Sequence, residues 1–293
     1  MSGNRRCEVC YGSTWVGDLM KKVLLTGASG FVGRQILRAL SRFDVQVIPV
    51  LRSDKAPNFF NQDNISDVIY SPNIFKESET WWAEKCAGIH TLIHCAWYVE
   101  PGQYLESPKN IECLIGSLNI ARGSVEAGVT RFVGIGTCFE YKLSEHVLST
   151  DTPLDPKSPY AACKAALYMT LSKWLPKESV EFVWCRLFYL FGEGEDDRRL
   201  APLIHDRLAK GEIVELEDGE CIRDYLDVAI AGDLIAEAAL GVREGAVNIC
   251  SGVPITIREF ALNIAKIYGR PDLLKFDAGK VKNFNPSRVV GKE

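Results

Sequence analysis

The stretch Lys22-Val-Leu-Leu-Thr-Gly-Ala-Ser-Gly-Phe-Val-Gly33 determines how the rest of the chain is interpreted. Its apolar residues 23–25 are enough for a buried strand and too few for a helix. The run ends at Thr26-Gly27, and helical spacing of apolar residues follows from Phe31 to Leu40. A strand, a glycine turn and a helix in this order direct backbone N–H groups at an anionic phosphate. The stretch predicts a nucleotide site, and the alternative is an ordinary tight turn.

Length and composition limit the class of protein. At 293 residues the chain suits one large domain or two coupled ones. A net charge of -4 and an isoelectric point near 5.7 give no basic surface for nucleic acid. No apolar run approaches membrane-spanning length and no segment looks like a signal peptide, so no membrane is expected as a partner. Ten scattered cysteines indicate reduced, buried thiols in a cytoplasmic protein.

The N-terminal stretch is expected to stand apart from the fold. Residues 1–19 lack periodicity, whereas Met20 leads directly into the first strand. We therefore expect 1–19 to be a disordered or mis-called tail. Cys7 and Cys10 supply only half of a four-ligand zinc site, and no metal is expected.

Short apolar runs alternate with helical patterns along most of the chain. Strands are expected at 23–25, 45–51, 68–70, 91–95, 132–135 and 182–187, and helices at 31–40, 77–86, 105–127 and 160–175. This alternation predicts an α/β fold, a Rossmann-like doubly wound parallel sheet covered on both faces. Shorter elements follow, with helices at 202–210, 229–240 and 257–268 and strands at 213–216 and 247–250. We expect an NAD(P)-binding domain over 20–190 and a smaller substrate-binding lobe over 191–293, partly interleaved with the sheet.

Tyr160 and Lys164 form the strongest candidate for catalysis. They lie four apart at the start of a helix and so share one face. An ammonium beside a phenol favours the phenolate and is expected to lower the phenol's pKa toward the range useful for proton transfer. Thr137 follows the strand at 132–136, where its hydroxyl would face the same cleft. The alternative is that Tyr160 only packs and Lys164 is only solvated.

These motifs together resemble those of the extended short-chain dehydrogenase/reductase family. Within it, the chain is similar to the NAD(P)-dependent nucleotide-sugar epimerases, dehydratases and reductases. The resemblance covers roughly Lys21 to Val290 and rests on Thr26–Gly33, Thr137, Tyr160-x-x-x-Lys164, Arg186–Gly194 and Gly219–Val228. It implies that Tyr160 is the acid/base, that Lys164 lowers its pKa and holds the nicotinamide ribose, and that Thr137 orients the substrate oxygen.

The resemblance also implies two binding sets. Besides Tyr160 and Lys164, the cofactor set is Gly27, Ser29, Gly30, Phe31, Val32, Gly33, Arg52, Cys95 and Ala96. The substrate set is Trp97, Thr137, Tyr189 and Arg223. The Arg223 guanidinium suits the oxygens of a diphosphate. Its alternative role is a surface salt bridge with Asp224 or Asp227.

The end of the second strand bears on the choice of cofactor. A carboxylate there binds the ribose 2′-hydroxyl of NAD, whereas an arginine accommodates the 2′-phosphate of NADP. The chain has Arg52-Ser53, with no carboxylate before Asp54. Charge therefore favours NADP(H), and NAD stays open because Arg52 could instead stack on the adenine.

The residues after Thr137 narrow the reaction. In this family, 4,6-dehydratases usually carry Asp-Glu there, whereas this chain has Cys138-Phe139, so dehydration is not expected. The segment Ala96–Pro101 resembles that of sugar 4-ketoreductases, and Arg52 suits an exchangeable NADPH. We expect reduction of the C4 ketone of a nucleotide-linked 4-keto-6-deoxy sugar. An NAD-dependent 4-epimerase is the first alternative, and a catalytically silent cofactor-sensing or scaffold protein is the second.

Two expectations about the whole molecule follow from the family resemblance. Relatives commonly form a homodimer through the helices that correspond to Leu105–Ala127 and Tyr160–Leu175. Relatives also usually continue beyond the segment that ends here at Glu293, so a truncated C-terminus is expected.

Overall fold

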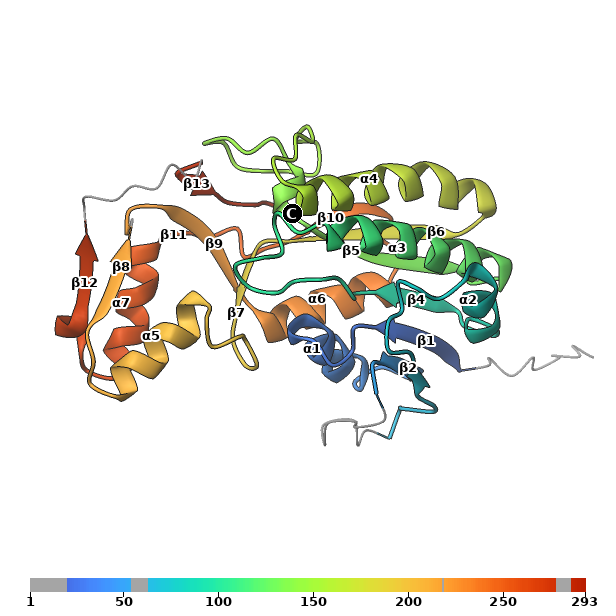
Figure 1. Cartoon of the computed structure of the whole chain (residues 1–293), viewed down its shortest axis with the longest axis horizontal. Coiled ribbons are helices and arrows are strands. Elements are labelled where there is room, and N and C mark those ends of the chain that lie inside the picture. The colour runs from blue at the N-terminus through green and yellow to red at the C-terminus, as the bar shows by residue number, and fades with distance from the viewer. Residues whose placement is uncertain (1–19, 54–62, 218, 278–285) are drawn as a thin grey trace, which may run out of the picture.

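The computed structural model describes residues 20–53, 63–217, 219–277 and 286–293 (Figure 1). The expected tail, 1–19, with Cys7 and Cys10, lies outside the described residues, and so does Asp54.

A seven-stranded parallel sheet forms the larger part of the protein. Its strand order is β10-β6-β5-β4-β1-β2-β3. The strands are β1 (Lys21–Thr26), β2 (Val45–Leu51), β3 (Ile69–Tyr70), β4 (Thr91–His94), β5 (Arg131–Thr137), β6 (Glu181–Leu187) and β10 (Gly245–Ile249). The order reverses between β1 and β4, and doubly wound sheets bind their ligands at that point. The predicted Rossmann-like fold is confirmed.

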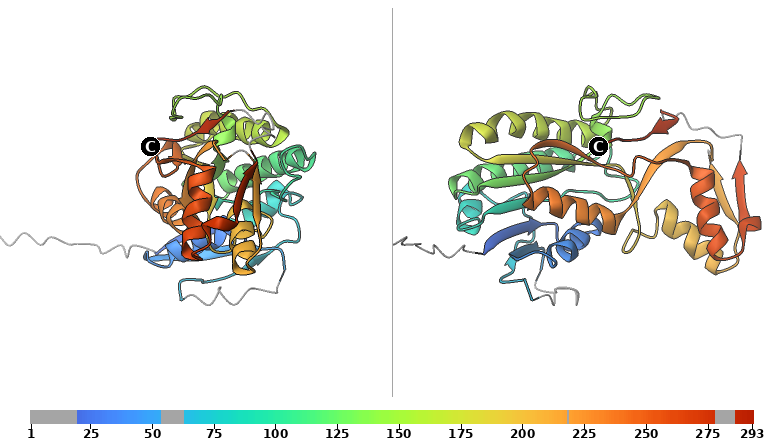
Figure 2. Two further views of the ribbon diagram at one scale, coloured as in Figure 1. Left: turned by 90° about the vertical axis from the view of Figure 1, so that its left-hand side faces the viewer. Right: turned by 180° about the vertical axis from the view of Figure 1, so that it is seen from behind.

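Helices cover both faces of this sheet, and the view from behind shows the same layers (Figures 1 and 2). One layer contains α1 (Phe31–Leu40) and α6 (Val228–Leu240), and the other contains α2 (Glu79–Lys85), α3 (Lys109–Glu126) and α4 (Pro159–Trp174). Because successive strand residues point to opposite faces, Val23 and Leu25 enter the α1/α6 core and Leu24 enters the α3/α4 core. The short apolar run of β1 is therefore buried on both faces.

The elements after Phe191 contribute to two parts of the molecule. α6 and β10 return to the large sheet, where β10 pairs with β6. The remaining helices, α5 (Leu200–Ala209) and α7 (Ile257–Ile267), pack in a separate core with β8 (Val214–Glu217) and β12 (Leu274–Asp277), at the left of Figure 1. Between the two parts, β9 (Ile222–Asp227) pairs with β7 (Tyr189–Phe191), β11 (Pro254–Thr256) and β13 (Arg288–Val289). The division at residue 190 stays a prediction.

Several class-level features can be stated for the described residues. No helix among them is both long and apolar enough to cross a membrane. No group of three or more His, Cys, Asp or Glu side chains in this part of the chain could hold a metal ion. Eight of the cysteines lie in this part as free thiols, and all of them except Cys95 are buried.

Candidate active site

The glycine turn after β1 brings three chain segments unusually close together. Gly27 has a φ of +72°, and a Cβ on it would lie 2.8 Å from the amide nitrogen of Ala96. A Cβ on Gly33 would lie 2.0 Å from the carbonyl oxygen of Gly27. The turn closes through a 2.9 Å hydrogen bond from the Gly30 amide to that same carbonyl. Close approach of backbone to backbone thus explains Gly27 and Gly33.

This turn fits the diphosphate of a dinucleotide. Gly30 is the N-cap of α1 and makes no side-chain cap, so amides of the first turn of α1 have no partner within the helix. Ser29 and Gly30 are exposed, whereas Phe31 and Val32 are half-buried beside them. An anion would be stabilised at this helix N-terminus. Arg52 is exposed at the end of the neighbouring strand β2.

We expect Gly33→Ala to lower the midpoint of thermal unfolding more than Gly30→Ala does. The Gly33 methyl group would collide with backbone, whereas a methyl group on Gly30 would meet the Gly27 oxygen at 3.2 Å with φ at −76°. Overpacking of this kind costs about 1–3 kcal/mol. Thermal unfolding of the two cofactor-free variants measures the difference, and equal midpoints would contradict the packing argument.

A buried hydrogen-bond chain joins the glycine turn to β4 and α3. His94 contacts the hydroxyl of Thr26 through Nδ1 at 2.9 Å and that of Ser117 through Nε2 at 2.8 Å. Burial lowers the pKa of His94 to about 3, so its imidazole is neutral. Thr26 in turn accepts the amide of Ala96 at 3.3 Å. The chain holds Cys95 and Ala96 beside the glycine turn, where the sequence places the cofactor.

Thr137, Tyr160 and Lys164 meet at the end of β5. All three are buried, with exposed fractions of 6%, 9% and 3%. α4 carries Tyr160 and Lys164 on one face because Ser158 caps the helix and Pro159 begins it. The ring of Tyr104 lies edge-on to that of Tyr160 at 4.9 Å between centroids. The structure brings together the residues that the sequence singles out for proton transfer.

The expected effect on the pKa of Tyr160 is corrected by the structure. Burial raises this pKa well above its usual value, with Tyr104 and Glu140 acting in the same direction and a hydrogen bond from Thr137 opposing them. The Lys164 ammonium is directed elsewhere, to the carbonyl oxygen of Ile135 at 2.5 Å. The sequence shows the spacing of Tyr160 and Lys164 but neither their burial nor that carbonyl. Tyr160 is therefore a neutral phenol, which can donate a proton.

The predicted substrate residues are distributed unequally around this centre. The ring of Trp97 is buried, donates Nε1–H to Asn110 at 2.8 Å and lies 3.9 Å from the Lys164 nitrogen. Trp97 thus packs behind Lys164. Tyr189 is half-buried, and the guanidinium carbon of Arg223 lies 5.4 Å from the centre of its ring.

Arg223 is held by main-chain carbonyls rather than by the carboxylates considered from the sequence. Its Nη1 donates to the oxygens of Ile222, Ser287 and Pro286 at 2.8, 3.2 and 3.4 Å. Asp224 accepts from Ser251, Gly252 and Gly291, and Asp227 caps α6. Among the described residues, no ion pair joins Arg223 to either carboxylate. Its guanidinium beside Tyr189 stays compatible with an anionic ligand.

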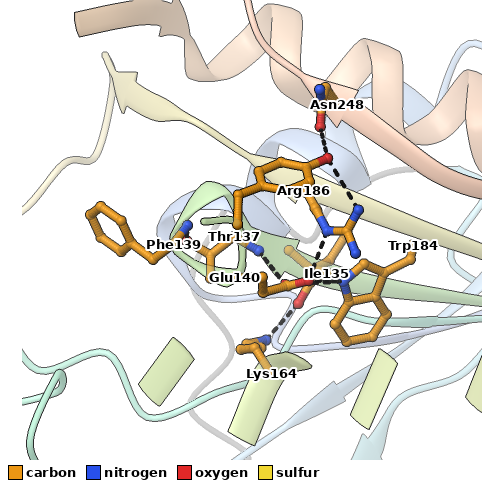
Figure 3. A network of polar contacts seen from close by, with 9 residues as sticks. Ile135, Thr137, Phe139, Glu140, Lys164, Trp184, Arg186 and Asn248 are labelled. Atoms are coloured by element: carbon orange, nitrogen blue, oxygen red, sulfur yellow. Dashed lines mark hydrogen bonds and ion pairs between the residues drawn. The ribbon is translucent and has the colours of Figure 1, made fainter. Parts of the chain in front are cut away.

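Glu140 and Arg186 form a buried pair that the sequence did not single out as a site. Arg186 Nε donates to Glu140 at 2.8 Å, and both side chains are at most 1% exposed (Figure 3). Arg186 lies in a motif used for the family resemblance, but no local pattern connects it to a residue 46 positions earlier. The pair lies next to Thr137 and belongs to the environment of the catalytic centre.

The sheet order, the glycine turn at its switch point and the Thr-Tyr-Lys set define a dinucleotide-binding enzyme fold. Residues 23–250 match the NAD dependent epimerase/dehydratase family, and the chain belongs to that family. The resemblance to extended short-chain dehydrogenases/reductases is thereby confirmed.

Individual relatives are distant. The chain is 24% identical over 242 residues to dTDP-6-deoxy-L-talose 4-dehydrogenase (NAD(+)) of Aggregatibacter actinomycetemcomitans, covering 80% of this chain and 86% of that one. It is similar in structure to UDP-N-acetylglucosamine 4-epimerase from Methanobrevibacter ruminantium M1, with a TM-score of 0.81, 20% identity and 93% and 89% of the two chains covered. A UDP-glucose 4-epimerase of Thermus thermophilus in complex with NAD gives 0.75, 23%, 92% and 90%. The structural likenesses show the fold.

Proposed function

We propose that the protein reduces the C4 ketone of a nucleotide-linked 4-keto-6-deoxy sugar with NADPH. The observation that carries this proposal is the environment of Thr137. Cys138 and Phe139 follow it, and the next carboxylate, Glu140, is fully buried against Arg186. The acid and base that dehydration needs beside Thr137 are therefore absent from residues 138–140. Hydride and proton transfer at C4 need only Thr137, Tyr160 and Lys164.

Two further observations support the direction of the reaction. The neutral phenol of Tyr160 is the form that donates a proton, as reduction of a ketone requires. The Aggregatibacter relative is named as a 4-dehydrogenase of a dTDP-6-deoxy sugar, and the reverse of such a reaction is reduction of a C4 ketone.

The residues have distinct roles in this mechanism. A bound nicotinamide cofactor supplies the hydride for C4. Tyr160 donates its proton to the oxygen of the substrate as negative charge develops there. The Thr137 hydroxyl holds that oxygen, and the Lys164 ammonium stabilises the charge across the short buried distance. Donors already in place before the reaction lower its barrier without reorganisation.

The preference for NADP(H) rests on Arg52, whose charge suits a 2′-phosphate. The Aggregatibacter relative carries NAD(+) in its name, so the preference needs its own test. We expect Arg52→Asp to shift the ratio of the NADPH and NADH dissociation constants toward NADH by about tenfold or more. Lys177→Asp, the same charge change on an exposed side chain at the opposite end of the sheet, is the control. An unchanged ratio would remove the argument for NADP(H).

The reaction is tested by NADPH oxidation with a panel of nucleotide-linked 4-keto-6-deoxy sugars generated in situ. Oxidation with one of them supports the reductase. Interconversion of UDP-sugars on NAD that stays bound through purification would replace it with the 4-epimerase, which uses the same three residues. Binding of NADPH without turnover of any sugar would leave the silent cofactor-sensing protein.

We also propose a cytoplasmic homodimer that pairs through α3 and α4. These helices pack against each other and expose Ile111, Ile115 and Met169 at more than half of their surface. A hollow of about 460 Å³ lies between them, lined by Ile115, Leu118, Asn119, Arg122, Thr170 and Trp174. Exposed apolar surface of this kind often forms an interface. The molar mass in solution, from light scattering, tests the proposal.

A further inference from the structure

The carboxylate of Glu140 contacts the catalytic centre although it is shut off from solvent. Its side chain is completely buried. Oε1 accepts the main-chain amide of Thr137 at 2.8 Å, and both oxygens lie 3.0 Å from Trp184 Nε1 (Figure 3). Oε2 accepts from Arg186 at 2.8 Å. A buried carboxylate with this many donors has a fixed position.

The sequence of β5 makes room for this arrangement. A Cβ on Gly136 would lie 2.2 Å from Trp184 Nε1 and 2.4 Å from Glu140 Oε1. A Cβ on Gly134 would lie 2.3 Å from the same indole ring. The two glycines before Thr137 therefore let Trp184 and Glu140 lie directly over the strand.

Arg186 is itself held in place, so the pair does not move as a unit. Its guanidinium carbon lies 4.6 Å from the ring centre of Tyr141 and 4.3 Å from that of Tyr168. Nη1 donates to the Tyr141 hydroxyl, which donates to Asn248 at 2.6 Å. The network thus reaches from the end of β5 across β6 to β10 (Figure 3).

We propose that Glu140 is a positioning residue of the catalytic centre, which sets the place of the Thr137 hydroxyl through the Thr137 amide. Thr137 begins a capping box: its hydroxyl accepts the amide of Phe139 at 3.3 Å while Glu140 accepts its own amide. The same turn thereby orients backbone and hydroxyl together. The inference rests on the role of Thr137 in the proposed function. A purely structural ion pair would not need to accept the Thr137 amide.

Two double variants separate the two roles. Replacing both members of a buried ion pair with apolar or neutral groups is often tolerated, whereas removing one is not. Glu140→Leu with Arg186→Met removes every acceptor for the Thr137 amide. Glu140→Gln with Arg186→Met removes the same charges but keeps an acceptor oxygen. Circular dichroism and thermal unfolding establish that both are folded.

The first readout needs no substrate. We expect the Thr137 amide, followed by NMR, to exchange with deuterium at least about tenfold faster in the leucine double variant, with the Val133 amide of the same strand unchanged. In the glutamine double variant it should stay protected. Equal protection of the Thr137 amide in both variants would overturn the inference, whatever reaction the enzyme catalyses.

The second readout uses the turnover that the wild type shows with its sugar substrate. The leucine double variant should lose roughly 10- to 100-fold in kcat, a size typical of a misplaced catalytic group, with the cofactor dissociation constant unchanged. The glutamine double variant should regain most of that loss. In a Thr137→Val background the leucine pair should add little, since the hydroxyl is already gone. The same loss in both backgrounds would mean that Glu140 does not act through Thr137.

Discussion

Tyr160→Phe is expected to lower kcat about 10²- to 10⁴-fold, the range for loss of a general acid, with cofactor affinity unchanged. The substitution removes one oxygen and keeps the ring. Tyr160 is buried and its ring lies edge-on to Tyr104, so packing is preserved. Only the proton donor disappears.

The control for this prediction is Tyr268→Phe. Tyr268 lies just after α7, in the smaller lobe, and its hydroxyl contacts His205 at 3.0 Å, away from the catalytic centre. It should leave kcat unchanged. Steady-state NADPH oxidation measures both variants, and turnover by Tyr160→Phe within a few-fold of wild type would exclude Tyr160 as the acid.

The features that the sequence predicted well are local ones. The run 23–25, the glycine turn and the helix from Phe31 are encoded within twelve residues, because periodicity and glycine spacing act over short distances. The pairing of Tyr160 with Lys164 follows from helical spacing alone. The larger sheet could be predicted because its strands alternate with long helices.

The features that the sequence missed depend on contacts between distant segments. β7, β11 and β13 have three residues or fewer, too short to show a period, and their common partner β9 lies elsewhere in the chain. Glu140 looks like an ordinary residue until Arg186 and Trp184 close over it. Burial, which reverses the expected shift in the pKa of Tyr160, likewise comes from the whole fold.

Lys164→Met is expected to stabilise the cofactor-free protein near pH 7 while lowering kcat about 100-fold or more. Lys164 is almost fully buried, and burial lowers its pKa from 10.5 to about 8 despite opposing effects of Cys95, Glu140 and Cys113. This difference corresponds to a cost of roughly 3 kcal/mol for burying the ammonium. Loss of the hydrogen bond to Ile135 offsets about 1 kcal/mol of the gain.

The pH dependence of this difference has a definite sign. The pKa of Lys164 is lower in the folded protein than in the unfolded chain, so the ammonium destabilises the fold fully below about pH 8. The cost disappears as the pH rises toward 10.5, where the unfolded chain also loses its proton. The advantage of Lys164→Met in the unfolding midpoint, roughly 2–5 °C at pH 7, should therefore shrink toward zero between pH 8 and 10.5.

Lys157→Met is the matched control, since Lys157 is exposed and pairs only with Asp155 at the surface. It should show no comparable difference at any pH. A Lys164→Met variant that is less stable than wild type at pH 7, with a gap that does not vary with pH, would show that the ammonium is not buried at a cost. A residue that destabilises the fold and yet is needed for turnover has a catalytic reason to be there. Lys164 should show both effects in one variant, because the same buried ammonium that weakens the fold stabilises the negative charge that develops on the substrate.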